Sequence, residues 1–349
     1  MSSLSFLLIF LFQVETPDQI MALPNDLVKD LDTRIIRSMS GDEKLQVIKQ
    51  LISSGGSNLP IAYDGPGTQT VAETWHNKRA NCLSMTFLIV AMARHVGLES
   101  RFHNYLDLDL YTENEEEVFY NLHMVAFIKT RPESWVQQDF ARTGNPPPGG
   151  IYQDVSDELA IAQFYNNKAA DALTQQNWKL AQQYLDSAIR IAPNYIASWR
   201  NSGVLFTRMG RFEAASYAYQ EALVLNPDDE LTWFNLAMLF QRWGKGEEQF
   251  FAQKKVEKVR ASNPFYQNGK AWEAIHHGDY KKAETFARRA LHLNKKHPVF
   301  HHTYAVVLFH LNKEEKAMSE LELAAKYSQN SEQEQLFRDK QAYLARLGD

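Results

Sequence analysis

Residues 81–94 read NCLSMTFLIVAMAR, and this stretch decides how the first half of the chain folds. Apolar side chains occupy most of its circumference at helical spacing, which predicts a buried helix with Asn81 as its N-cap. Cys82 then lies in the first turn. A thiol at that place feels unpaired backbone N–H groups and the positive end of the helix dipole, and both favour the thiolate that attacks carbonyl carbons.

Cys82 is the only cysteine among 349 residues, so no intramolecular disulfide can form. Its position at the start of a helix favours a nucleophile, although a lone cysteine on a buried helix is also an ordinary packing residue.

A histidine and an aspartate follow Cys82 on two expected strands. Alternation in residues 121–128 (NLHMVAFI) predicts a strand that carries His123, and Asp139 follows in WVQQDF at 135–140. A thiol enzyme needs an imidazole to hold and deliver the proton and an acceptor that fixes the ring tautomer. His103, on an earlier expected strand, is the alternative imidazole, and Asp139 has an alternative role as an acid capping a strand end.

The remaining pattern surrounds this constellation with helices and strands. Helical spacing covers Asn25 to Met39 and Asp42 to Ile52, and Thr70 is placed to cap a further helix. Strands are expected at Ser100 to Leu110, Val118 to Lys129 and near Trp135 to Phe140, with an acidic loop at Thr112 to Glu117. Asn145 to Gly150 (NPPPGG) marks a break between domains.

Residues beyond this break repeat with a period of 34. Small residues recur at the same phase in five successive units, and turn glycines and helix-ending prolines keep the same register. The phased positions include Ala169, Gly203, Ala237, Ala271 and Ala305; Ala188, Ala222, Val256, Ala290 and Ala324; and Ala181, Ala215, Gln249, Ala283 and Ala317. Only the third unit departs, at Gln249 and Val256.

These two patterns resemble known families. Residues 162–331 resemble tetratricopeptide repeats, and residues from about 60 to 142 resemble a transglutaminase-like, papain-fold core in the order Cys82, His123, Asp139. The whole chain from about Leu23 is similar to bacterial proteins that fuse the two. The resemblance implies that Cys82 is the nucleophile, His123 the general base and acid, and Asp139 the group that orients it.

The resulting fold class is an α+β transglutaminase-like (papain-fold) N-terminal domain followed by an all-α tetratricopeptide-repeat solenoid. We expect an apolar N-terminal segment at 1–22, the first domain at 23–144, a Pro/Gly linker at 145–160, and five repeats with a capping helix at 161–349.

Composition limits the partners. A hydrophobic content of 44% suffices for two ordinary cores, and the formal charge of -5 favours neither nucleic acid nor an anionic membrane as a partner. Seven histidines between His276 and His310 are irregularly spaced, so we expect no metal and no cofactor.

The N-terminal block Leu4 to Phe12 is too short to span a bilayer but long enough for the core of a signal segment. It slightly favours an exported or membrane-associated protein over a cytoplasmic one, with a start codon assigned downstream of the true one. The alternative is an apolar arm packed on the domain.

The expected function is that of a thiol hydrolase or acyltransferase that acts on a peptide-like amide through a Cys82 thioester, with repeats that bind a protein or peptide. Two alternatives stay open. One is a repeat-based adaptor whose papain-like domain is silent, and the other is a cross-linking transferase that uses an amine acceptor. The sequence assigns no second oxyanion donor beside the backbone N–H of Cys82.

Overall fold

The computed structural model describes residues 14–54, 60–63, 67–106, 111–114, 117–120, 123–139, 151–328 and 331–348. They belong to two units. Met1–Tyr105, His123–Thr143 and Tyr152–Asn226 form the first, and Leu106–Leu122, Gly144–Ile151 and Pro227–Asp349 form the second. The apolar block at 4–12 and the Pro/Gly run at 145–150 lie outside the described residues.

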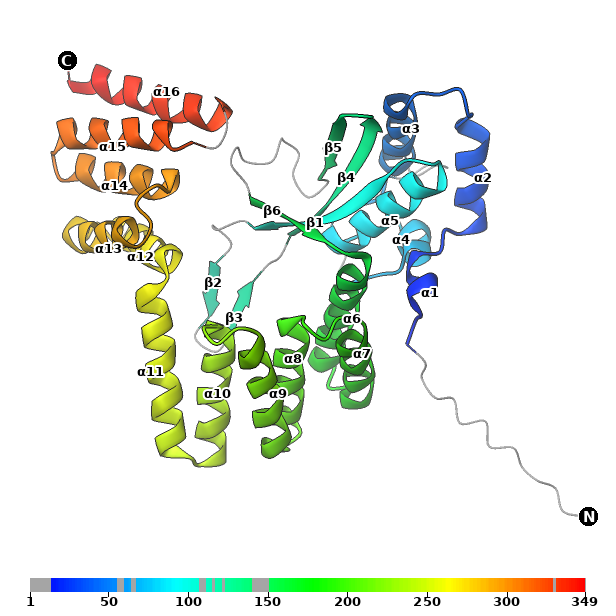
Figure 1. Cartoon of the computed structure of the whole chain (residues 1–349), viewed down its shortest axis with the longest axis horizontal. Coiled ribbons are helices and arrows are strands. Elements are labelled where there is room, and N and C mark those ends of the chain that lie inside the picture. Colours follow the sequence, from blue (N-terminus) through cyan, green and yellow to red (C-terminus); the bar gives the residue numbers. More distant parts are fainter. Residues whose placement is uncertain are drawn as a thin grey trace, which may run out of the picture. The chain divides into compact units, whose positions relative to one another are not determined.

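The elements follow the chain as labelled in Figure 1. The first unit contains short helices, four strands and two helix pairs: α1 (Pro17–Met21), α2 (Asn25–Arg34), α3 (Gly41–Ser54), α4 (Val71–Asn77), α5 (Cys82–His95), β1 (Ser100–Leu106), β4 (His123–Arg131), β5 (Ser134–Gln138), β6 (Ile151–Val155), α6 (Asp157–Thr174), α7 (Trp178–Ile191), α8 (Ile196–Arg208) and α9 (Phe212–Leu225).

The second unit contains one strand pair and a run of helices. Its elements are β2 (Tyr111–Asn114), β3 (Glu117–Tyr120), α10 (Glu230–Trp243), α11 (Gly246–Ser262), α12 (Pro264–His276), α13 (Tyr280–Leu293), α14 (Pro298–His310), α15 (Glu314–Lys326) and α16 (Ser331–Gly348).

Helix α5 is surrounded by other elements, as its composition predicts. The side chain of Asn81 accepts a hydrogen bond from the backbone N–H of Ser84, and every residue from Leu83 to Ala93 is buried. The helix packs against β4 on one side and against α1, α3 and α4 on others. Because no face is left for solvent, a helix this apolar is stable only in such a place.

A four-stranded sheet lies against α5 in the order β5-β4-β1-β6. Strands β1 and β4 are antiparallel, with Tyr105 opposite His123. Alternate residues on one face, among them Phe102, Met124 and Ala126, join the apolar core. The acidic loop expected at Thr112 to Glu117 was wrong, because most of this range belongs to β2 and β3, which form a separate antiparallel pair. The strand expected at 118–129 corresponds to parts of β3 and β4.

The predicted helix at Asn25 to Met39 was too long. Helix α2 ends at Arg34, and Ile35 takes an extended conformation. Ile35 packs against the core while Ile36 is exposed. The helical spacing in the sequence had instead predicted that the helix continues through both residues. The capping role of Thr70 is confirmed, because its side chain accepts from the N–H of Glu73 at the start of α4.

Residues 157–326 form five helix pairs, α6–α7 to α14–α15, and α16 follows them. The phased small residues are buried where paired helices cross: a Cβ atom on Gly203 would lie 2.3 Å from the ring of Tyr219, so only glycine fits there. The turn within each pair has one residue of positive φ, again at steps of 34 residues: Gln176, Gly210, Gly244, Gly278 and Asn312.

The third pair departs from the others, as its sequence indicates. Helix α11 has 17 residues, whereas α9 and α13 have 14 each. It buries Ala252 and Val256 but leaves Phe250 and Phe251 60% and 56% exposed. Gln249, in the place of the usual alanine, is half-buried, whereas Ala252 and Val256 keep the phase of the buried Ala218 and Ala222 of α9.

A single apolar core joins the sheet, α5 and the first helix pair. The ring of Phe87 on α5 lies 5.1 Å from that of Phe102 on β1 and 6.1 Å from that of Phe164 on α6. Buried residues of α7, among them Leu185, belong to the same cluster. Strand β6 and helix α6 therefore begin within the range that the sequence assigned to a linker, and the first repeat packs as part of this core.

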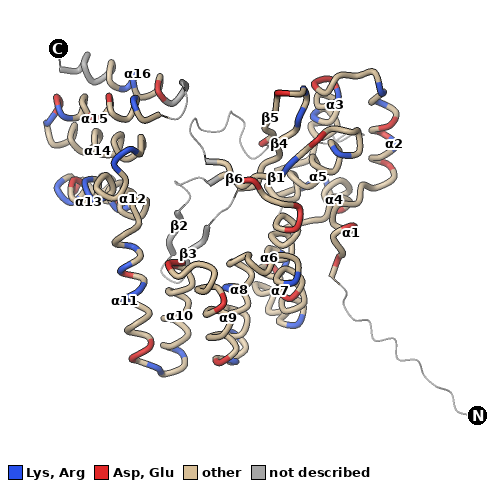
Figure 2. The backbone as a smooth tube through the Cα atoms, in the orientation of Figure 1, with Lys and Arg blue, Asp and Glu red and all other residues tan. Residues whose placement is uncertain are grey.

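Charged side chains of both signs are interspersed along the helices of each unit (Figure 2). Within the described residues, no helix combines the length and the apolar character that a membrane span requires.

Candidate active site

Cys82 is the first residue of α5, and the loop before α4 holds this end of the helix. The side-chain amide of Asn81 donates to the hydroxyl of Thr68 at 3.0 Å, and the N–H of Gln69 donates to the hydroxyl of Ser84 at 2.8 Å. The N–H of a first helical residue has no acceptor within its own helix. The half-buried thiol therefore lies at the edge of the core, beside free N–H groups of the helix end.

His123 and Asp139 come together at the ends of neighbouring strands. His123 is the first residue of β4, and Asp139 directly follows β5, which pairs antiparallel with β4. Nε2 of His123 lies 2.8 Å from Oδ1 of Asp139, and the two side chains are 13% and 6% exposed. A carboxylate this well buried fixes the orientation of the imidazole ring and favours the protonated form of that ring.

The thiol of Cys82 is hydrogen-bonded to the ring of His123. Since Nε2 is occupied by Asp139, Nδ1 is left to face the sulfur. Burial alone would lower the pKa of His123, but the hydrogen bonds and charges of Asp139 and Cys82 raise it to about 9. Burial would conversely raise the pKa of Cys82, yet His123 and the backbone N–H of Met124 hold it below its ordinary value. Both directions favour a thiolate–imidazolium pair.

Thr86 ties the first turn of α5 to β4. Its buried hydroxyl lies 2.8 Å from the carbonyl oxygen of Cys82 and 2.9 Å from that of Met124, the neighbour of His123. The nucleophile and the histidine are thus connected through backbone contacts as well as through their side chains.

Comparisons with known proteins assign both halves of the chain. The model of the transglutaminase-like superfamily matches residues 31–140, and two tetratricopeptide-repeat models match residues 203–244 and 274–337. The chain carries a transglutaminase-like domain followed by tetratricopeptide repeats. A comparison with curated proteins gave no match.

Solved structures similar to this chain include PilF, YrrB and MamA. PilF of Pseudomonas aeruginosa has 15% identity over 55% of this chain and 87% of its own, with a TM-score of 0.29. YrrB, described as a TPR protein with an unusual peptide-binding site, has 12% identity over 51% and 92%, with a TM-score of 0.27. MamA of Desulfovibrio magneticus RS-1 has 13% over 49% and 96%, with a TM-score of 0.28.

The structure adds Tyr63 to the residues around the thiol of the transglutaminase-like domain. Ala62 forms a bridge with Arg79, which lies three residues before Cys82, and this bridge brings Tyr63 close to the cysteine. The hydroxyl of Tyr63 is hydrogen-bonded to Cys82. Burial and the charges of Cys82 and Asp139 raise the pKa of Tyr63, so the phenol keeps its proton. Sequence reasoning missed it because the bridge at Ala62 leaves no periodic signal.

His103, the alternative imidazole, belongs to a different pair. Its Nε2 lies 2.6 Å from Oδ1 of Asp154 on β6, and its ring packs on Phe127 at 4.1 Å between centroids. Two further His–Asp pairs are His76 with Asp26 and His95 with Asp32. Of these four pairs among the described residues, the one containing His123 reaches the cysteine.

The histidines of the last repeats make contacts with protein groups. His301 binds the carboxylate of Glu320 at 2.6 Å and the carbonyl of Lys295, while His302 lies 2.8 Å from Nζ of Lys340. Among the described residues, no group of three or more His, Cys, Asp or Glu side chains is arranged to hold a metal ion.

Proposed function

We propose that the transglutaminase-like domain is a thiol enzyme that hydrolyses or transfers a peptide-like acyl group through a thioester on Cys82. One observation supports this above all: the thiol at the start of α5 contacts His123, whose other nitrogen is held by Asp139. A buried imidazole oriented by a carboxylate and touching a thiol is the arrangement that nucleophilic catalysis requires.

The chemistry proceeds in two steps. The thiolate of Cys82 attacks the amide carbonyl carbon, the C–N bond breaks, and the imidazolium of His123 gives its proton to the leaving amine. Water then loses a proton to His123 while its oxygen attacks the thioester, and the C–S bond breaks to restore the thiolate. An amine in place of water would give transfer instead of hydrolysis, and hydrolysis is the default that we propose.

We infer that two groups stabilise the oxyanion of this reaction. The backbone N–H of Cys82 is one, as the sequence indicates. The hydroxyl of Tyr63 is the other, because it already contacts the sulfur and its raised pKa keeps it a donor. It supplies the second donor that the sequence left unassigned.

The repeats provide the partner site in this proposal. Stacked helix pairs present an extended surface suited to a peptide or protein, and such a surface can deliver a substrate to the thiol.

The test uses the single thiol of the full chain. p-Nitrophenyl acetate should acylate Cys82, with the adduct located by mass spectrometry, and iodoacetamide should alkylate it faster than a free thiol at mildly acidic pH. Both reactions should be lost in His123→Gln. His103→Gln, the matched change in a His–Asp pair that does not reach the cysteine, should keep them.

Tyr63→Phe separates the oxyanion role from thiol activation. Acylation should slow about 10²-fold, in the range found for loss of one oxyanion donor, whereas alkylation, which forms no oxyanion, should change only a few-fold. A thiol that reacts no faster than free cysteine in the unmodified chain would refute the enzyme and favour an adaptor. Incorporation of a labelled primary amine into a protein acceptor would favour the cross-linking transferase over the hydrolase.

A further inference from the structure

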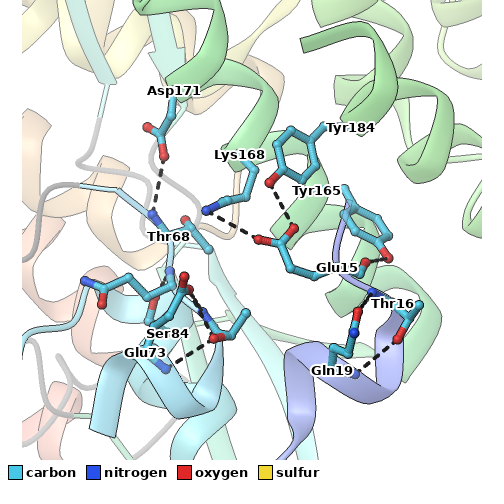
Figure 3. A network of polar contacts seen from close by, with 12 residues as sticks. Glu15, Thr16, Gln19, Thr68, Glu73, Ser84, Tyr165, Lys168, Asp171 and Tyr184 are labelled. Atoms are coloured by element: carbon cyan, nitrogen blue, oxygen red, sulfur yellow. Dashed lines mark hydrogen bonds and ion pairs between the residues drawn. The ribbon is translucent and has the colours of Figure 1, made fainter. Parts of the chain in front are cut away.

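Helix α6 of the first repeat touches the turn that precedes α4. Oδ2 of Asp171 on α6 lies 3.4 Å from the backbone nitrogen of Thr68, which donates to it (Figure 3). Gly67 has a φ of +87°, and a Cβ atom there would lie 2.9 Å from the same oxygen. The carboxylate therefore fits closely against this turn, and burial raises its pKa although Thr68 and Lys168 oppose that shift.

The same turn holds the amino end of α5. Thr68 is only 3% exposed, and its hydroxyl accepts from the side chain of Asn81, whose oxygen in turn caps the N–H of Ser84 at 2.9 Å. Gln69 adds a backbone donor to the hydroxyl of Ser84. Asp171 is thus separated from the first turn of the cysteine helix by one tightly bonded loop.

Helix α6 is also fixed at a second place, to the segment that precedes α1. Tyr165 donates to the carbonyl oxygen of Glu15 at 2.5 Å, Tyr184 on α7 donates to its carboxylate at 2.9 Å, and Lys168 lies 3.8 Å from that carboxylate (Figure 3). Because these contacts and the shared apolar core prevent α6 from shifting alone, Asp171 can act as a rigid support.

We propose that Asp171 is a positioning residue for the thiol: the first repeat holds the 67–69 turn, and through it the capped first turn of α5, in the conformation that favours the thiolate of Cys82. This inference rests on the proposed function. It assigns the first repeat a role in forming the site, in addition to any role in partner binding.

The test compares three variants in the full-length protein. Asp171→Ala removes the acceptor, Asp171→Asn keeps an acceptor oxygen of nearly the same shape, and Asp186→Ala is a matched control that removes an exposed aspartate from α7 of the same repeat. The readout is the rate of Cys82 alkylation by iodoacetamide between pH 5 and 9, with thermal unfolding measured in parallel.

Asp171→Ala should slow alkylation at pH 6.5 by about two- to tenfold, the worth of one hydrogen bond, and move the midpoint of the pH profile upward. Asp171→Asn should restore the rate to within about twofold, and Asp186→Ala should leave the profile unchanged. Thr68→Val keeps the backbone donor to Asp171 but removes the hydroxyl that accepts from Asn81. Because the two contacts act in series between α6 and α5, Thr68→Val should show a similar loss without adding to it in the double variant.

The outcomes distinguish the positioning role of Asp171 from the proposed thiol-enzyme function. If the unmodified chain shows no lowered thiol midpoint, the proposed function fails. If that midpoint is lowered but Asp171→Ala changes only the melting temperature, or nothing, the positioning role fails while the proposed function stands.

Discussion

Replacing Asp139 with asparagine is the change that most directly probes the thiolate–imidazolium pair. The amide keeps the shape of the side chain but removes the charge that faces Nε2 of His123 at 2.8 Å. Both side chains are nearly buried, so water cannot take over the role of the carboxylate.

The size of the effect follows from the pKa of His123, which the site raises from an ordinary 6.5 to about 9. That difference corresponds to about 3 kcal/mol in favour of the protonated ring. Without the carboxylate, burial opposes the charge, and we expect the pKa to fall by at least about two units. At neutral pH the ring would then be neutral, and the pKa of Cys82 would rise because it has lost its cationic partner.

The sign of the pH dependence is set by the same numbers. A histidine whose pKa is raised on folding adds stability that is complete below about pH 6.5 and is lost as the pH rises through about 9. A Cys82→Ser background removes the coupled thiol. Because Cys82 contributes part of the raised pKa of His123, the free energy of unfolding in that background should decrease over a narrower interval above about pH 6.5, and by less than about 3 kcal/mol. Asp139→Asn should abolish this decrease.

Two measurements check the prediction. Titration of the His123 ring resonances by NMR should give a pKa near 9 in the unmodified chain and below about 7 in Asp139→Asn. Alkylation of Cys82 at pH 6.5 should slow at least about tenfold. Superimposable titration curves for the two proteins would show that the carboxylate of Asp139 does not stabilise the protonated ring of His123, and would refute the proposed role of Asp139.

Two further predictions concern stability. Thr86→Val removes the hydroxyl that connects α5 to the carbonyl of Met124, and it should lower the free energy of unfolding in urea by about 1–3 kcal/mol, since a buried acceptor loses its donor; no loss would mean that water replaces the contact. Gly203→Ala should cost about 1–3 kcal/mol, because the added methyl group meets the ring of Tyr219, whereas Gly246→Ala in α11, where a Cβ atom meets nothing within 4 Å, should be nearly neutral in the same urea titration.

Local patterns in the sequence predicted the parts of the fold that depend on local chemistry. The apolar circumference of α5 and its Asn81 cap are both present, as are the five helix pairs with their phased small residues. Each of these signals is contained within one helix or one repeat. The order Cys82, His123, Asp139 also anticipated the three side chains that the structure brings together.

Contacts between distant segments were not predictable in this way. Tyr63 lies near Cys82 because of one isolated bridge, between Ala62 and Arg79, and Asp171 is separated from Thr68 by 103 residues in the sequence. Neither contact produces a periodic pattern in the sequence. The early end of α2 at Arg34 also depends on tertiary packing of the residue that follows it.

The apolar core shared by α5, α6 and α7 also limits how this chain can be rearranged by recombination. A crossover at residue 144 would exchange one repeat array for another, but it would also remove Phe164, which contacts Phe87, and leave the cysteine helix open to water on that side. A viable chimera must therefore inherit the first repeat together with the thiol domain, and its crossover point must lie beyond Ile191.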